Sequence, residues 1–176
     1  METEGKVLTV MGDDVDTDII YPARYLSLFD EKEVAKHLFE DIDPGFIQRA
    51  RAGGIIWAGK SFGCGSAREQ AATALKHVGI QLVIARSFSR SFYRNAINNG
   101  LPLLEIIGEG DVKWADEGDL LMVNVDRGFV VNTATGRTCR CIPPAAFIVE
   151  VLQMGGICNY YLKNKGREMA EGVCSQ

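Results

Sequence analysis

Short apolar runs alternate with helix-like segments through the first two thirds of the chain. The run over residues 53–58 predicts a strand, and the continuous apolar run over residues 81–85 is typical of a buried parallel strand. Residues 67–77 favour a helix that ends at Gly79. Strand, helix and strand in this order predict a right-handed βαβ unit, and its first loop then lies at the carboxyl edge of the sheet, where such folds bind ligands.

The same patterns predict elements on both sides of this unit. Further strands are expected at residues 6–11, 101–105, 120–125, 129–132 and 137–141. Further helices are expected at residues 31–39, 46–51, 87–98 with Ser87 as cap, 143–152 and 157–162. We therefore expect one α/β domain over residues 1–165, with a central, mostly parallel sheet and a small β-rich part, followed by a mobile tail over residues 166–176.

Composition narrows the class of protein. The chain has 176 residues, of which 47% are hydrophobic, and a formal net charge of -4, so its charge does not favour nucleic-acid binding. No apolar run approaches the ~20 residues that a membrane-spanning helix needs. The first five residues are acidic where a signal peptide would be basic. We expect a cytoplasmic protein.

The metal-binding residue types are few and badly spaced. The five cysteines include no C-x-x-C pair, and the chain has only two histidines, His37 and His77. Neither a disulfide framework nor a zinc site is predicted, because both need regular ligand spacing. We expect this chain to hold no metal by itself.

The loop between the first strand and the helix of the βαβ unit has the features of an anion site. Gly63 and Gly65 carry no Cβ, so the backbone there can approach a ligand closely. The first turn of the following helix offers unpaired N–H groups and the positive end of the helix dipole. A carboxylate or a phosphate is the ligand that this arrangement favours.

Ser66 and Arg68 place a hydroxyl and a guanidinium in one turn of that loop. A serine becomes a proton acceptor when a neighbouring cation and backbone donors stabilise its alkoxide, so the pair can abstract a proton. The alternative is structural: Ser66 caps the helix, and Glu69 completes a capping box. Cys64, between the two glycines, is either a reactive thiol at a helix start or a small side chain that fills the loop.

Two groups of charged residues have both structural and functional interpretations. Residues 13–18 contain four aspartates, which suggests a divalent cation, local turn hydrogen bonds, or ion pairs with arginines from elsewhere. Arg86, Arg90 and Arg94 recur at four-residue spacing, either on a solvated helix face or directed at a ligand or at the aspartates. Residues 23–29 are too apolar for an ordinary loop, so they either pack under a neighbour or line a pocket.

Several motifs together resemble one family. They are Asp16-Thr17-Asp18-Ile19-Ile20 with Tyr25-Leu26, the run from Phe62 to Glu69, and Arg86-Ser87-Phe88 with Asn95 and Asn98 to Gly100. Over about residues 7–162 the chain resembles the small subunits of 3-isopropylmalate dehydratase. These subunits are free-standing versions of the swivelling β/β/α domain at the C-terminus of aconitase.

The resemblance implies a function that needs a second chain. In that family a large subunit holds a [4Fe-4S] cluster, and the small subunit closes over it to form a heterodimer or a higher heteromer. Carried over by position, Ser66 is the base that removes a proton from carbon, and Arg68 stabilises its alkoxide or a substrate carboxylate. The N–H groups of Ser66 and Ala67 assist as donors, and Gly65 belongs to the same substrate-binding loop. The isolated chain is then expected to be catalytically silent.

The resemblance also points to a branched malate as substrate. Substrate choice in the family is set at the segment aligned with Tyr25, Leu26, Ser27 and Leu28, and Arg24 lies beside it. Homoaconitases carry arginine at the position of Ser27, where it pairs with an additional carboxylate. A small hydroxyl here favours an apolar branch, as in isopropylmalate, the intermediate of leucine biosynthesis, or in citramalate or 2,3-dimethylmalate.

Two departures from the family pattern bear on this choice. Many relatives have serine where this chain has Ala67 and histidine where it has Gln70.

Two other classes of function remain open from the sequence. One is a non-catalytic subunit that binds an anion on the glycine loop, and the other is a structural interaction subunit in which Ser66 is only a helix cap.

Overall fold

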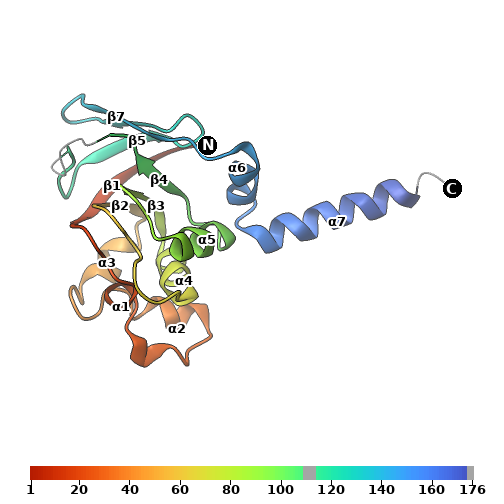
Figure 1. Cartoon of the computed structure of the whole chain (residues 1–176), viewed down its shortest axis with the longest axis horizontal. Helices are drawn as coiled ribbons and strands as arrows, with labels where there is room; N and C mark the ends of the chain where they lie inside the picture. Colours follow the sequence, from red (N-terminus) through yellow and green to blue (C-terminus); the bar gives the residue numbers. More distant parts are fainter. Residues whose placement is uncertain (109–113, 174–176) are drawn as a thin grey trace.

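Strands and helices alternate from β2 to β4, as the hydrophobic pattern predicts for this part of the chain (Figure 1). The computed structural model describes residues 1–108 and 114–173, with the side chains of residues 1–108 and 114–165. Its elements are β1 (Glu2–Met11), α1 (Thr17–Ile20), the 3-10 helix η1 (Ala23–Tyr25), α2 (Glu31–Ala35), α3 (Phe46–Ala50), β2 (Gly54–Ala58), α4 (Glu69–Val78), β3 (Ile80–Ala85), α5 (Arg90–Asn98), β4 (Leu103–Ile106), β5 (Leu120–Asn124), β6 (Phe129–Asn132), β7 (Thr138–Ile142), α6 (Ala146–Gln153) and α7 (Ile157–Val173). Among the described residues, no helix combines the length and apolarity needed to span a bilayer.

The strands close into a barrel in the order β1-β2-β3-β4-β7-β6-β5. The pairs β1–β2, β2–β3 and β3–β4 are parallel, and the pairs that involve β5, β6 and β7 are antiparallel. The expected parallel sheet and β-rich part are therefore both present, but they form one barrel. β1 joins the two parts of the barrel. It begins at Glu2 rather than at residue 6. Its residues Glu2–Lys6 pair with β5, and its residues Val7–Met11 pair with β2.

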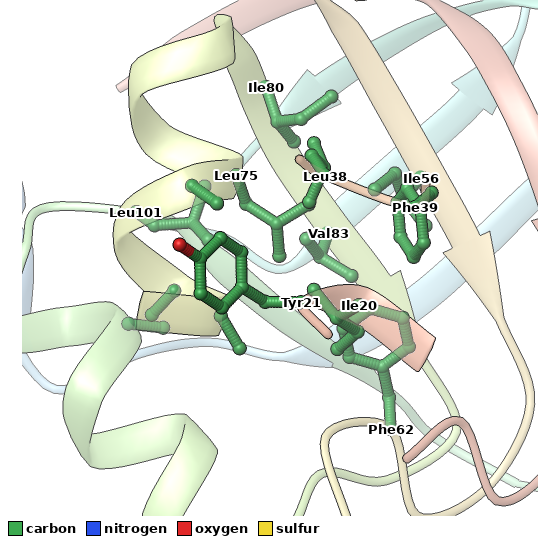
Figure 2. Close-up of a cluster of buried hydrophobic side chains, with 14 of the residues drawn as sticks. Ile20, Tyr21, Leu38, Phe39, Ile56, Phe62, Leu75, Ile80, Val83 and Leu101 are labelled. Atoms are coloured by element: carbon green, nitrogen blue, oxygen red, sulfur yellow. The ribbon is translucent and has the colours of Figure 1, made fainter. Parts of the chain in front are cut away.

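Both faces of the parallel strands are buried, which explains their continuous apolar sequence. Ile55 and Trp57 of β2 face a core inside the barrel, whereas Ile56 and Ala58 face a second core under the helices. This division follows from the two-residue period of a strand. Figure 2 shows the second core, where Leu75 of α4 lies among side chains of the strands and of α1. The helical layer thus fixes α1 and α4 against the same sheet.

Several helix ends differ from the prediction. α2 ends at Ala35 rather than at residue 39, and α7 continues to Val173, beyond residue 162, and extends away from the barrel in Figure 1. Ser89, not Ser87, caps α5 by accepting a hydrogen bond from the Phe92 N–H, at 3.3 Å. Residues 174–176 of the expected tail lie outside the described residues, and the division into a domain and a mobile tail stays a prediction.

Candidate active site

The loop between β2 and α4, residues 59–68, is fixed to two other segments of the chain. The Phe62 N–H donates to the Ser87 carbonyl, and the Phe62 carbonyl accepts from the Ser89 N–H, both at 3.0 Å. On the other side, the Gly63 N–H donates to the Val15 carbonyl at 2.8 Å. Because its backbone is bonded on both sides, the loop has a defined conformation before any ligand binds.

Gly63 and Gly65 are both required by this conformation. Their φ angles are 75° and 83°, in the left-handed region that favours glycine. A Cβ on Gly63 would overlap the ring of Phe92, and one on Gly65 would overlap the carboxylate of Asp16. Close approach of the backbone is thus confirmed for these glycines, although the approach is to the protein's own side chains.

Ser66 is exposed, and it is not the cap of α4. The helix begins at Glu69 with Arg68 in the N-cap position, so the interpretation of Ser66 as cap, and of Glu69 as part of a capping box, is wrong. Within the described residues, the Ser66 hydroxyl forms no hydrogen bond. The Ser66 carbonyl is held instead, by the Thr17 hydroxyl at 2.8 Å and by the Arg68 N–H at 2.7 Å. The backbone is therefore fixed while the hydroxyl remains available.

Three consecutive backbone donors belong to Ser66 and to its two neighbours in the chain. Within the described part of the chain, the N–H groups of Gly65, Ser66 and Ala67 have no acceptor, and all three residues are exposed. They precede the N-terminus of α4, whose dipole adds positive potential. Unpaired N–H groups at such a position bind carboxylate or phosphate oxygens. The loop therefore offers an anion site next to an available hydroxyl.

Arg68 is directed at Asp18. Its two terminal nitrogens donate to the two oxygens of that carboxylate, with Nη2 to Oδ2 at 2.9 Å, and Nη1 also lies 3.4 Å from the Tyr21 carbonyl. The Arg68 side chain is only 12% exposed, and its Nε is buried with no hydrogen-bond partner among the described residues. The hydrogen bond from Arg68 holds the pKa of Asp18 below its usual range.

The aspartates of residues 13–18 make turn and ion-pair contacts. Asp13 accepts from the Lys60 N–H at 2.7 Å, Asp16 caps α1 by accepting from the Asp18 N–H at 2.7 Å, and Asp18 binds Arg68. Two of the three explanations open from the sequence thus apply together. Among the side chains described, those of residues 1–108 and 114–165, no cluster of three His, Cys, Asp or Glu is placed to hold a metal ion.

The arginines at four-residue spacing do not meet these aspartates. Arg90 and Arg94 of α5 are exposed. In the described part of the chain, none of Arg86, Arg90 and Arg94 forms an ion pair with residues 13–18. The interpretation of Arg90 and Arg94 as a solvated helix face is confirmed.

The segment of residues 23–28 lies beside the Ser66 loop. The side-chain amide of Gln70, in the first turn of α4, is 3.4 Å from the Leu26 carbonyl. The Leu26 and Leu28 side chains pack partly against the helical core, whereas Ser27 is exposed. The interpretation that this apolar segment packs under a neighbouring element is therefore confirmed for Leu26 and Leu28, and the interpretation that it lines a pocket stays a prediction.

Arg24 is engaged by carboxylates of the chain. It forms a bidentate ion pair with Asp41, at 2.8 and 2.6 Å, and its Nη2 lies 3.6 Å from Glu40. The hydrogen bond to Asp41 raises the pKa of Arg24 and lowers the pKa of Asp41. Arg24 is therefore held by the chain's own carboxylates.

Two residues near this segment were missed by the sequence analysis. His37 and Glu40 follow α2, and both contact the side chain of Tyr25. Their spacing of three residues was the only sequence signal, and it is too common to indicate a site. Three cavities, of about 840, 470 and 690 Å³, are lined by none of residues 24–28 and 65–68, whereas Arg90 and Arg94 line the one of 470 Å³.

The chain is similar in sequence to several known proteins. Residues 46–107 match the family described as aconitase C-terminal domain. The chain is 45% identical over 157 residues to a 3-isopropylmalate dehydratase small subunit of Caldanaerobacter subterraneus subsp. tengcongensis, covering 89% of this chain and 96% of that protein. It is 47% identical over 152 residues to a methanogen homoaconitase small subunit of Methanothermobacter thermautotrophicus, covering 86% of each.

A solved structure extends the similarity to the whole fold. The crystal structure of a 3-isopropylmalate dehydratase chain from Methanocaldococcus jannaschii superposes with a TM-score of 0.87 at 40% identity. The superposition covers 97% of this chain and 99% of that one. The expected fold of an aconitase C-terminal domain is thereby confirmed.

Proposed function

The chain belongs to the family of 3-isopropylmalate dehydratase small subunits, and from that membership we propose that it is the small subunit of a hydro-lyase acting on a branched malate. The reaction we favour is the isomerisation of 2-isopropylmalate and 3-isopropylmalate by loss and re-addition of water, a step of leucine biosynthesis. The observation that carries this proposal is the exposed Ser66 hydroxyl next to the N–H groups of residues 65–67, all without a hydrogen-bond partner among the described residues.

Ser66 is the proposed base. Dehydration requires a proton to leave the carbon next to the one that bears the hydroxyl, and an alkoxide can accept it. The adjacent N–H groups of Gly65 and Ala67 and the N-terminus of α4 stabilise negative charge at this position. The structural alternative loses its main support, because α4 is capped at Arg68 and not at Ser66.

In this proposal Arg68 releases the carboxylate of Asp18 and binds a carboxylate of the substrate instead. Its guanidinium is bound to Asp18 and its Nε is buried, so contact with substrate requires the Asp18 carboxylate to move aside. The Asp18 side chain is 54% exposed, so solvent can take up its carboxylate once the ion pair opens. A substrate carboxylate then takes over the bidentate contact, which an arginine provides better than a lysine because of its planar fork.

The proposed specificity wall is formed by Tyr25, Leu26, Ser27 and Leu28, which belong to the segment of residues 23–28. Ser27 is exposed and neutral, and Arg24 beside it is already paired with Asp41. Ser27 offers no cation to a third substrate carboxylate, and Arg24 would have to leave both Asp41 and Glu40 to meet it. Leaving that carboxylate unpaired in a closed site is costly. An apolar branch therefore fits better than the extra carboxylate of a homoaconitase substrate. A methyl-branched malate, such as citramalate or 2,3-dimethylmalate, is the runner-up.

The proposed partner is a large subunit that carries the [4Fe-4S] cluster. The described side chains of this chain do not fit such a cluster, since no three of its potential ligands come together in residues 1–108 and 114–165. When bound, the cluster's open iron supplies Lewis-acid activation of the substrate hydroxyl and carboxylate. We propose that residues 1–165 swivel as one domain onto that subunit, which closes the open Ser66 loop and excludes water from it.

Co-expression with candidate large subunits tests this function. The reconstituted complex, assayed without oxygen on isopropylmalate, citramalate, 2,3-dimethylmalate and homocitrate, should turn over isopropylmalate best. The isolated chain should have no activity. Binding of malates by the isolated chain, together with no partner-dependent turnover on any of the four compounds, would instead support a non-catalytic anion-binding subunit.

A further inference from the structure

The side chain of Tyr25 is held by a cluster of three residues that lie outside the Ser66 loop. The His37 imidazole stacks on its ring, with centroids 3.6 Å apart and planes 15° apart. The Tyr25 hydroxyl donates to Glu40 Oε1 at 3.0 Å, and Glu40 Oε2 is 2.6 Å from His37 Nδ1. The Arg24 guanidinium lies over the same ring, with Cζ 4.8 Å from its centroid. Ring and hydroxyl are therefore both fixed.

The backbone of Tyr25 is fixed as well. The Tyr21 hydroxyl donates to the Tyr25 carbonyl at 3.0 Å, and Tyr21 is fully buried in the helical core. The Leu28 N–H donates to the same carbonyl at 3.0 Å, which turns the chain so that Ser27 is exposed. Tyr25 is thus the point at which the specificity wall is attached to the rest of the fold.

His37 contacts both Tyr25 and Glu40. It contacts the Tyr25 ring by stacking, and it contacts the acceptor of the Tyr25 hydroxyl through Nδ1. With its Nδ1 protonated, the imidazole donates to one oxygen of Glu40 and leaves the other to Tyr25. The hydrogen bond from His37 is also the largest cause of the lowered pKa of Glu40. Burial opposes this lowering, and the hydrogen bond from Tyr25 adds to it.

From this geometry we infer that His37 is a positioning residue, which sets the place of the specificity wall by holding Tyr25. The inference rests on the proposed function, since it concerns substrate choice at that site. A surface ion pair alone would contribute little. The His37 and Glu40 side chains are only 22% and 35% exposed. Three contacts act together: the stack of His37 on the Tyr25 ring, the hydrogen bond from the Tyr25 hydroxyl to Glu40, and the contact between Glu40 and His37.

The first test is hydrogen exchange on the isolated chain. In His37→Ala, peptides covering residues 23–28 should exchange about tenfold faster than in the unchanged chain, because local opening becomes easier. In His77→Ala the same peptides should be unchanged. His77 is the matched control, since it also pairs with a glutamate, Glu31, at 2.6 Å, but does not contact Tyr25. Equal exchange in the two variants would overturn the inference.

The second test separates positioning from a general structural role. In the reconstituted complex, His37→Ala should raise KM for isopropylmalate about tenfold with kcat within about twofold, because wall contacts are lost while the base is kept. The preference for isopropylmalate over citramalate should fall by a similar factor. His37→Phe, which keeps a ring on Tyr25, should recover part of the loss. An equal loss of kcat for all substrates, or no change, would contradict the inference.

A double-mutant cycle locates the effect. If His37 acts through Glu40 and Tyr25, then His37→Ala with Glu40→Ala should raise KM no more than the larger single change, because both remove the same support. Additive effects would contradict that route. If no malate is turned over by any complex, the proposed function fails, whereas the exchange experiment still decides whether His37 holds the segment.

Discussion

The Arg68 guanidinium and the Asp18 carboxylate form a bidentate ion pair that joins segments 50 residues apart in the chain. Asp18 follows the cap of α1, and Arg68 is the N-cap residue of α4. The pair therefore connects the Ser66 loop to α1. It also neutralises the cation that the site would use, so Asp18 determines when Arg68 is available to a ligand.

This pair makes stability depend on pH in acid. The folded-state pKa of Asp18 is lowered by the hydrogen bond from Arg68, so its contribution is full above the ordinary pKa of 3.8 and is lost as pH falls through the lower, folded value. Urea unfolding of the unchanged chain and of Asp18→Asn should differ by less than about 1 kcal/mol at pH 7, since the pair is partly exposed. That difference should shrink below pH 3.8. A difference that is constant from pH 7 to pH 3 would contradict the pairing.

Ser66→Ala should separate catalysis from stability. As the base, its loss should lower kcat of the reconstituted complex by about 10³-fold or more. Because Ser66 is exposed and is not the cap of α4, the free energy of unfolding should change by less than about 0.5 kcal/mol. Ser91→Ala, an exposed serine on α5, is the matched control and should change neither quantity. A loss of about 1 kcal/mol with turnover intact would restore the cap interpretation.

Gly65→Ala should distort the site. The new Cβ meets the Asp16 carboxylate at a φ of 83°, so we expect a loss of about 2–4 kcal/mol in the free energy of unfolding, together with loss of turnover. Gly136→Ala is the control, because its φ is 68° but a Cβ there meets nothing within 4 Å. It should cost only the backbone strain, about 1 kcal/mol. Equal losses in the two variants would show that contact with Asp16 is unimportant.

Ser27→Arg should change substrate choice. A guanidinium on the wall gives a third carboxylate a partner and opposes an apolar branch, so kcat/KM for isopropylmalate should fall at least about tenfold while homocitrate turnover appears. Phe29→Arg adds the same charge to a side chain that is 87% exposed, and it should leave the ratio of the two substrates unchanged. An unchanged ratio in Ser27→Arg would remove Ser27 from the specificity wall.

Cys64 should be an unreactive thiol. Burial raises its pKa, and the nearby charges of Asp16 and Asp14 raise it further, which opposes the interpretation of Cys64 as a thiol activated by a helix start. α4 begins five residues later, at Glu69. At pH 7, alkylation with iodoacetamide, followed by peptide mass spectrometry, should modify the exposed Cys158 at least about tenfold faster than Cys64. Equal rates would contradict the assignment.

The sequence by itself determined the local order of the fold. The apolar run before Gly63 and the run over 81–85 specified β2 and β3, because strands buried on both faces need apolar residues throughout. The positions of Gly63 and Gly65 specified a loop that no other residue type accommodates. These features depend on residues close together in the chain, so the sequence alone predicts them.

Tertiary structure decided everything that depends on partners distant in the chain. The sequence indicated Ser66 as the cap of α4, but the helix begins at Glu69 with Arg68 in the N-cap position, and the Ser66 carbonyl accepts from the Thr17 hydroxyl, which is 49 residues away in the chain. The pairing of β1 with β5 closed the barrel, and the fold placed His37 against the ring of Tyr25. Such contacts are chosen by the packing of the whole chain, because a side chain with several possible partners binds the one that the fold brings near.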